Sequence, residues 1–364
     1  MLLLPLLLAA GPARHPAKAP RSAASKAAVK SKPQAQSLTA KPDPGEAQKT
    51  YPLQSIAFPG GVSMHEMIYS RLTGFRPLTL DLYATAGKGP PRPGLIFIHG
   101  GDWNSGDARH AASFGDFPGL LAALAGRGVV VASINYRLSG EAHFPAALQD
   151  VKTAVRWLRS HAGDYDMDPT RIAVWGADAG GYLAALTGTS CGVAMFDPPS
   201  GEGDKPPSDC VQAVIDWYGI ANFETMAADL GKTPPDKSPA GDFLGCEPTL
   251  CSIGMAHNAS PLTYIETMSP PFLIQHGAQD DVVSPKQSQL LYDALRAKDV
   301  PAELVIYPGV GHGFALVANS SAGASDPATD RQVVEKLETF LDNIFPTKSA
   351  SSPSPPSQSQ SPPY

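Results

Sequence analysis

The sequence predicts an α/β fold, a mostly parallel eight-stranded sheet with an antiparallel N-terminal edge and helices on both faces. Strand-like and helix-like segments alternate from about residue 51 to residue 346, which is typical of βαβ units. The strand-like segments are short apolar runs that end in turn residues, as the buried strands of a parallel sheet do. The length of 364 residues fits one large domain better than two small ones.

The N-terminal part of this domain should form the antiparallel edge, because its strand-like segments follow one another before the first helix. These segments are residues 54–58, 64–70 and 78–85. The parallel strands are expected at residues 94–98, 129–134, 171–175, 211–218, 271–275 and 302–307. The clearest helix spans residues 144–161, where Ala147, Val151 and Leu158 recur at helical spacing, and another follows at residues 179–188.

Both ends of the chain differ in composition from this domain, which is expected to span residues 51–346. Residues 1–13 include an apolar stretch that is too short to cross a bilayer and is typical of a secretory signal. Residues 14–50 predict a disordered basic linker, and residues 347–364 a disordered Ser/Pro tail. We therefore expect a secreted or periplasmic protein without a transmembrane segment.

The charge of the chain is divided unequally between these parts. Residues 11–50 hold eight Lys or Arg against two acidic residues, and one further Lys lies in the tail. Since the total formal charge is -6, residues 51–346 carry -13. An acidic body argues against nucleic acid as a partner. The basic linker is more simply a solvated tether than a binding arm.

A sharp turn is predicted between the strand at residues 171–175 and the helix that follows it. Small residues at 176, 177, 179 and 180 allow a strained strand-to-helix turn that lifts one side chain above the sheet. The lifted residue is Asp178. A helix N-terminus beneath it favours a negative charge.

Further polar residues follow other strands, and ligands of open α/β sheets bind beyond the carboxyl ends of the strands. His99 to Trp103 follow one strand, Asp280 lies after Gln275-His276-Gly277, and His312 follows the last strand. We call the strand-to-helix turn at Asp178 the elbow. Along the chain the elbow residue Asp178 is followed by the acid Asp280 and then by His312, which is the order of a catalytic triad.

At these residues the chain resembles the secreted α/β-hydrolase carboxylesterases related to feruloyl and acetyl-xylan esterases and, more distantly, to hormone-sensitive lipase. The resemblance covers roughly residues 51–345, nearly the whole of the predicted domain. The matching motifs are His-Gly-Gly-x-Trp at 99–103, Asn-Tyr-Arg-Leu at 135–138, Phe-Pro-Ala-Ala at 144–147 with Asp150, the elbow, and His-Gly-x-x-Asp at 276–280. It implies an α/β-hydrolase fold and a serine nucleophile at 178, a position that Asp178 occupies here.

The resemblance also implies roles for single residues. Asp280 rather than Asp281 would be the acid, with His312 as base. The paired glycines Gly100 and Gly101 could simply turn the chain, but their place after a strand favours an oxyanion hole, completed by the amide of Ala179. The remaining expectations are a pocket wall at Trp103, an unassigned pocket role for Asp102, and a loop-tying role for the helix residue Asp150.

Three interpretations of Asp178 are open at this point. Its carboxylate could be a nucleophile toward non-ester substrates, as in haloalkane dehalogenases and epoxide hydrolases, which share the fold. The scaffold could instead bind esters and turn them over poorly or not at all, because attack by a carboxylate on an ester is uphill. Asp178 could also be a laboratory substitution or a sequence error in an ordinary esterase.

The sequence thus predicts a carboxylic ester hydrolase with an atypical elbow residue. The loops at residues 192–209 and 225–258 are rich in Pro, Gly and Asp, so we expect small acyl or aromatic esters, such as acetyl or feruloyl esters on polysaccharide, over long lipids. This chemistry requires no metal and no cofactor. The alternative is a non-catalytic protein that binds esters, against which the retained base and acid argue.

Four cysteines lie between the elbow helix and the late strands, and four thiols allow three pairings. Closeness along the chain favours Cys191 with Cys210 and Cys246 with Cys251. A zinc site is disfavoured because no C-x-x-C pair is present, and buried unpaired thiols would go with a reducing compartment.

Overall fold

The computed structural model describes residues 53–87, 89–111, 114–198, 206–231, 238–246, 252–316 and 327–346. All of them belong to one compact unit, Pro52–Tyr364. The predicted signal, linker and tail, at residues 1–13, 14–50 and 347–364, lie outside the described residues. None of the described helices is both long and apolar enough to span a membrane.

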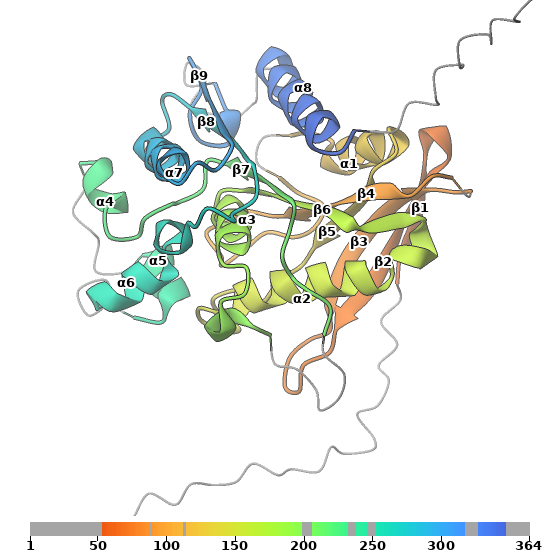
Figure 1. Ribbon diagram of the computed structural model, residues 1–364, viewed down its shortest axis with the longest axis horizontal. Coiled ribbons are helices and arrows are strands. Elements are labelled where there is room, and N and C mark those ends of the chain that lie inside the picture. The colour runs from red at the N-terminus through yellow and green to blue at the C-terminus, as the bar shows by residue number, and fades with distance from the viewer. Residues whose placement is uncertain are drawn as a thin grey trace, which may run out of the picture. The chain divides into compact units, whose positions relative to one another are not determined.

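A single sheet of nine strands runs through the described part of the chain (Figure 1). The spatial order is β1-β2-β3-β5-β4-β6-β7-β8-β9. The bounds are β1 Ser55–Phe58, β2 Val62–Ser70, β3 Leu78–Thr85, β4 Arg92–Ile98, β5 Val130–Ile134, β6 Met167–Ala177, β7 Ala213–Trp217, β8 Phe272–Gly277 and β9 Ala302–Tyr307.

The pairing confirms a mostly parallel sheet with an antiparallel N-terminal edge. Strands β1, β2, β3 and β5 pair antiparallel, and every pair from β5 through β4 to β9 is parallel. The sheet has nine strands where eight were predicted, although each of the nine strand-like segments named from the sequence does form a strand. The short β1 pairs with β2, with Ser55 opposite His65.

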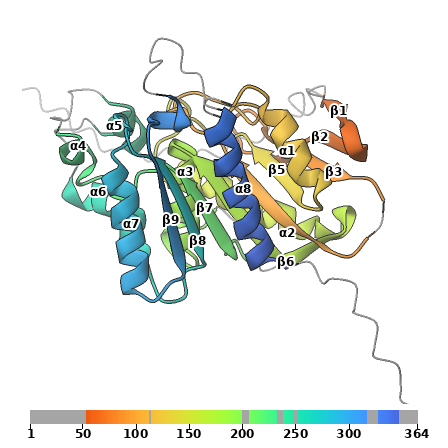
Figure 2. The same cartoon turned by 90° about the horizontal axis from the view of Figure 1, so that it is seen from above.

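Helices cover both faces of the sheet (Figures 1 and 2). Their bounds are α1 Phe117–Gly126, α2 Ala146–Ser160, α3 Ala179–Thr189, α4 Met226–Asp229, α5 Pro239–Leu244, α6 Ile253–Ala259, α7 Pro285–Ala297 and α8 Pro327–Ile344. Helices α1 and α8 share one apolar cluster with the sheet, whereas α2, α3, α5 and α7 share the other. Short 3₁₀ turns η1 to η5 lie at Pro59–Gly61, Ala162–Tyr165, Ala194–Phe196, Pro261–Tyr264 and His312–Phe314.

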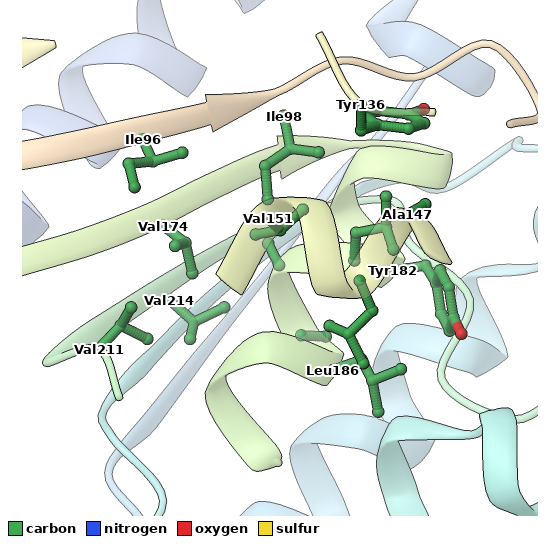
Figure 3. Close-up of a cluster of buried hydrophobic side chains, with 14 of the residues drawn as sticks. Ile96, Ile98, Tyr136, Ala147, Val151, Val174, Tyr182, Leu186, Val211 and Val214 are labelled. Atoms are coloured by element: carbon green, nitrogen blue, oxygen red, sulfur yellow. The ribbon is translucent and has the colours of Figure 1, made fainter. Parts of the chain in front are cut away.

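The core beneath the site lies between the sheet and helices α2 and α3 (Figure 3). Strand residues such as Ile96 and Val174 meet Val151 of α2 and Leu186 of α3, and all four are fully buried. Truncation of such a side chain to Ala costs about 2–5 kcal/mol. This packing fixes α3, and therefore the turn at its N-terminus, against the sheet.

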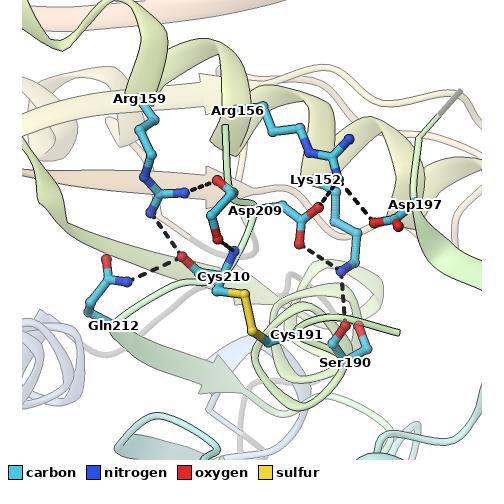
Figure 4. Close-up of a disulfide and its surroundings, with 10 residues drawn as sticks. Lys152, Arg156, Arg159, Ser190, Cys191, Asp197, Asp209, Cys210 and Gln212 are labelled. Carbon is cyan, nitrogen blue, oxygen red and sulfur yellow. Dashed lines mark hydrogen bonds and ion pairs between the residues drawn. A yellow bond between two sulfur atoms is a disulfide. The ribbon is translucent and has the colours of Figure 1, made fainter. Parts of the chain in front are cut away.

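The predicted pairing of Cys191 with Cys210 is confirmed by a disulfide that joins the end of α3 to the approach of β7 (Figure 4). Beside it, the fully buried Lys152 of α2 donates to the Ser190 carbonyl at 3.0 Å and to Asp209 at 3.1 Å. The other proposed pairing involves Cys251, which lies outside the described residues. The long segment between α3 and β7 is thus anchored at both of its ends.

Candidate active site

A pocket with a volume of about 510 Å³ lies at the carboxyl ends of β4, β6, β7 and β8, beside the turn η5. The structure brings Gly100, Gly101, Asp102, Asp178 and His312 together in its lining. Asp280 lies directly behind His312. The other lining residues are Gly106, His110, Ala177, Tyr218, Val282, Gly313 and Ala315.

Asp178 occupies the strained turn that the sequence predicts. Its backbone has φ 57° and ψ -120°, outside the helical values of α3 that follow. The turn needs glycine on both sides: a Cβ on Gly180 would lie 2.0 Å from the Ile98 carbonyl oxygen, and one on Gly176 would lie 2.0 Å from that of Gly180. A non-glycine residue in such a conformation costs about 1–3 kcal/mol, which the packing of α3 must offset.

The Asp178 carboxylate is held by backbone amides. Its Oδ2 accepts the N–H of Gly101 at 2.9 Å and the N–H of Asp102 at 3.2 Å. The donor pair therefore lies one residue later than the predicted Gly100 and Gly101, because the left-handed backbone at Gly101 (φ 99°) and Asp102 (φ 54°) turns those amides toward Asp178. These two N–H groups converge on one oxygen, as the donors of an oxyanion hole do, and here that oxygen belongs to the chain's own carboxylate. The place that they define is called the hole below.

Gly100 and Ala179 have roles in packing around this hole. A Cβ on Gly100 would lie 3.1 Å from Asp178 Oδ2 and 2.8 Å from the Ala177 carbonyl oxygen, so a side chain there would push the carboxylate away. Ala179 is buried at the start of α3. The two amides that bind the Asp178 carboxylate are those of Gly101 and Asp102, and the role of the Ala179 amide as a further donor stays a prediction.

His312 and Asp280 form a dyad beside the elbow. His312 Nδ1 lies 2.8 Å from Asp280 Oδ2, and His312 Nε2 lies 3.7 Å from Asp178 Oδ1. The other Asp280 oxygen, Oδ1, accepts the N–H groups of Val282 and Val283 at 2.9 Å each. The buried Asp280 rather than its neighbour Asp281 thus faces the histidine, and His312 bridges two carboxylates.

The pKa values in the dyad shift in opposite directions. Burial alone would lower the pKa of His312, but the hydrogen bond with Asp280 and the charges of Asp178, Asp280 and Asp102 raise it above its ordinary value. Burial would raise the pKa of Asp280, yet hydrogen bonds from His276 and His312 lower it well below the usual range. The arrangement therefore favours an imidazolium between Asp178 and Asp280.

Two pocket residues carry signals that the sequence reasoning did not use. Tyr218 follows β7 with a φ of 45°, and its ring centre lies 4.9 Å from that of His312. The run from Asp216 to Gly219 after a buried strand could have pointed to a second sharp turn here. His110 also lines the pocket, and its Nδ1 lies 2.8 Å from Asp107 Oδ1.

The prediction that Trp103 forms a wall of the pocket is wrong. The residue is only 2% exposed and its ring stacks on Phe243 at 4.6 Å. Its left-handed backbone (φ 58°) turns the indole away from the pocket and into the core. Asp102 does line the pocket, and burial together with the charge of Asp178 raises the pKa of its carboxyl.

Asp150 lies away from the pocket. Its carboxylate accepts hydrogen bonds from the Arg137 guanidinium at 2.7 Å and from the Arg137 backbone N–H at 2.8 Å, so it ties the segment after β5 to helix α2. This is the loop-tying role expected for it. Within the part of the chain that the structure describes, no group of three or more His, Cys, Asp or Glu is arranged to hold a metal ion.

Comparison with known proteins places this geometry in a family. The sequence matches the BD-FAE family over residues 80–295 and the prolyl oligopeptidase family over residues 254–347. It is 30% identical to the probable carboxylic ester hydrolase LipM of Mycobacterium tuberculosis over 85% of this chain and 66% of LipM. It spans 56% and 61% of the esterases LipC and LipQ of the same organism, so the chain covers less than two thirds of these relatives.

Solved structures show the same fold. Esterase 2 of Thermogutta terrifontis, with propionate bound, aligns with a TM-score of 0.62 at 26% identity over 80% of this chain and 97% of the esterase. The acetyl ester-xyloside bifunctional hydrolase of Caldicellulosiruptor lactoaceticus aligns with a TM-score of 0.58 at 25% identity over 74% and 89% of the two chains. The chain therefore belongs to the BD-FAE family and has the α/β-hydrolase fold of its esterase relatives.

Proposed function

We propose that this site is that of a carboxylic ester hydrolase for small acyl or aromatic esters, and that Asp178 holds its ester turnover far below that of a serine-bearing site. The observation that carries the proposal is the convergence of the two-amide hole and the His312–Asp280 dyad on the elbow residue. Such a hole stabilises the oxyanion of acyl transfer, and such a dyad supplies the base.

The family relationship and the size of the pocket support this substrate class. A volume of about 510 Å³ lies within the range for small-molecule sites. Relatives of known structure include an esterase with propionate bound and a hydrolase of acetyl esters and xylosides. An acetyl or feruloyl ester linked to polysaccharide would leave its sugar portion outside such a pocket.

Asp178 limits turnover for two reasons. Its Oδ2 occupies the place of the ester carbonyl oxygen, since it takes both amides of the hole. Attack by its carboxylate on an ester would also form a mixed anhydride while expelling a more basic alkoxide. Loss of the nucleophile of a triad lowers kcat by up to about a millionfold, and binding survives that loss. The chain is accordingly proposed to bind esters and to cleave them slowly.

The test is the steady-state hydrolysis of p-nitrophenyl acetate and methyl ferulate by the parent chain and by its Asp178→Ser and Asp178→Ala variants. We expect Asp178→Ser to exceed the parent by several orders of magnitude, because the hydroxyl both clears the hole and supplies the nucleophile. Asp178→Ala is the control, because it removes the carboxylate from the hole without supplying a nucleophile. A folded Asp178→Ser protein without a gain on either ester would refute the proposal.

Two further parts of the proposal concern substrate length and location. The described pocket lining contains no residue of the loops at 192–209 and 225–258, so the preference for small esters rests on the pocket volume and the family relationship. Cleavage of long-chain triglyceride by Asp178→Ser without cleavage of acetyl or feruloyl esters would contradict this substrate class. We also propose that the protein is exported, because residues 2–10 are apolar and a disulfide joins Cys191 to Cys210. Fractionation of the producing cells, with the protein followed by antibody, tests this location.

A further inference from the structure

We propose that His276 is a positioning residue that donates to Asp280 on the oxygen shared with His312 and so limits how tightly His312 holds its proton. The inference deepens the proposed function, and it rests on that function where it concerns ester hydrolysis. His276 is the last residue but one of β8 and is fully buried. It is not part of the described pocket lining, so it acts on a substrate only through Asp280.

The His276 ring lies against the same carboxylate oxygen as the His312 ring. His276 Nε2 lies 3.1 Å from Asp280 Oδ2, and His312 Nδ1 lies 2.8 Å from that oxygen. The other oxygen, Oδ1, accepts the N–H groups of Val282 and Val283. Two histidines therefore share Asp280 Oδ2, and of these two His312 is the one that lines the pocket.

The partners of His276 determine which of its nitrogens carries the proton. Nε2 faces two groups that only accept hydrogen bonds, which are Asp280 Oδ2 and the Val283 carbonyl oxygen at 2.9 Å. Nε2 must therefore be the protonated nitrogen. Nδ1 lies 2.6 Å from Oγ of the buried Ser288, whose hydroxyl has no other partner in the described part of the chain and so donates to Nδ1. The ring is thus neutral and donates to Asp280.

The backbone around the two histidines is closely packed. A Cβ on Gly277 would lie 2.4 Å from the Gly311 carbonyl oxygen, so the turn that carries His312 packs directly on the residue after His276. The two amides on Oδ1 also hold the carboxylate from the other side. Loss of the His276 donor would therefore change the charge on Asp280 more than its position.

The shared oxygen weakens the hold of Asp280 on the His312 proton. Burial alone would raise the pKa of Asp280, but hydrogen bonds from His276 and His312 lower it well below the usual range. A carboxylate oxygen whose charge is partly taken up by one donor attracts a second donor less strongly. Because His312 acts as a base only when it has lost its proton, the His276 donor favours the active form.

The other titratable groups near the dyad do not supply this donor. Among the described residues, His276 is the only donor besides His312 that contacts Asp280 Oδ2. Burial alone would lower the pKa of His312, whereas the nearby carboxylates raise it, so they strengthen the hold on the proton. The titratable groups that act on these three residues from other parts of the fold are Tyr218 after β7, Asp216 within β7, Asp178 at the elbow and Asp102 after β4.

The decisive experiment compares two amide substitutions that keep different positions of the His276 ring. The amide of His276→Gln reaches the place of Nε2 and still donates to Asp280. The amide of His276→Asn reaches only the place of Nδ1, so it keeps the contact with Ser288 and loses the one with Asp280. The ring protons of His312 are followed by NMR against pH in the otherwise unaltered chain, with His312→Gln for their assignment.

We expect the proton affinity of His312 to rise about twofold to eightfold in His276→Asn, so that its titration moves to higher pH. This range is about 10–30% of the attraction between two close charges, the share by which one hydrogen bond polarises the next. His276→Gln should titrate like the parent. His257→Asn, at an exposed histidine whose Nδ1 lies 3.4 Å from Glu224 Oε1, is the matched control and should leave His312 unchanged. An unchanged or lower midpoint in a folded His276→Asn protein, or an equal shift in His276→Gln, would overturn the inference.

A measurement on the unaltered chain decides the matter if neither variant of His276 folds. Nitrogen-15 spectra of the histidine rings show which nitrogen of His276 carries the proton. A proton on Nε2 and a bare Nδ1 would support the donor to Asp280. A bare Nε2, or protons on both nitrogens, would overturn the inference.

The consequence for ester hydrolysis is tested in the Asp178→Ser background. There kcat/KM for p-nitrophenyl acetate should rise with pH as His312 loses its proton, and addition of His276→Asn should move that rise to higher pH. Well above the midpoint the two rates should converge, whereas a merely structural defect would lower the rate equally at every pH and would contradict the proposed role. If Asp178→Ser cleaves no ester, the proposed function fails, and the NMR titration of the parent still decides the role of His276.

Discussion

Replacement of Asp178 by Asn keeps the shape of the side chain and a carbonyl oxygen for the hole, but removes the negative charge. That charge faces His312, whose Nε2 lies 3.7 Å from Asp178 Oδ1. Both side chains are mostly buried, since that of His312 is 25% exposed and that of Asp178 is 14% exposed. At an effective dielectric constant of about 20, unit charges at this separation attract by about 4 kcal/mol. Relief of the repulsion from Asp102 and the hydration of both groups in the unfolded chain offset part of this. We expect Asp178→Asn to lose about 2 kcal/mol of unfolding free energy under acidic conditions.

The pH dependence gives this prediction its sign. The folded-state pKa of His312 is raised, so the stability it contributes is fully present below its unfolded pKa of about 6.5 and is lost as pH rises through the folded value. The parent should therefore exceed Asp178→Asn by more at about pH 5.5 than at about pH 9. Urea unfolding of both proteins at the two pH values measures the difference, with Asp293→Asn on the exposed side of α7 as the control. Equal differences at both pH values would refute an ion pair between His312 and Asp178.

Two more predictions concern the frame around the site. Gly180→Ala should lower the free energy of unfolding by at least about 3 kcal/mol, because the added Cβ would lie 2.0 Å from the Ile98 carbonyl oxygen. Gly115→Ala is the control and should change it little, because nothing lies within 4 Å of a Cβ at that position. Thermal unfolding compares the two, and similar losses would contradict the close approach of α3 to β4. Lys152→Ala should lower the free energy of unfolding, measured in urea, by about 3 kcal/mol, because the fully buried ammonium donates hydrogen bonds to Asp209 and to the Ser190 carbonyl. A loss under about 1 kcal/mol would mean that Asp209 is satisfied without it.

The sequence predicted the parts of this molecule that depend on local pattern. The strands that alternate with helices, the elbow at Asp178 and the triad order are readable because buried strands, glycine-rich turns and polar strand ends leave marks over a few residues. The pairing of Cys191 with Cys210 was predictable because closeness along the chain favoured it. The acid at Asp280 was predictable from spacing in related sequences.

The parts that the sequence did not predict depend on single backbone angles. The left-handed conformation of Asp102, together with that of Gly101, decides which amides face Asp178, and that of Trp103 decides which way the indole turns. Neither residue is a glycine, so its type does not announce a positive φ. The place of Tyr218 beside His312 depends in the same way on its φ of 45° and on the pairing of β7 with β8. Such features arise from tertiary packing and leave no periodic pattern.

The proposed slow ester turnover rests on when negative charge is present at the two amides that bind Asp178. In ester hydrolysis the amides of Gly101 and Asp102 should meet a full charge only as the tetrahedral intermediate forms. Here they bind a charged oxygen before any substrate arrives, so their binding energy is expressed in the resting enzyme and hinders acyl transfer.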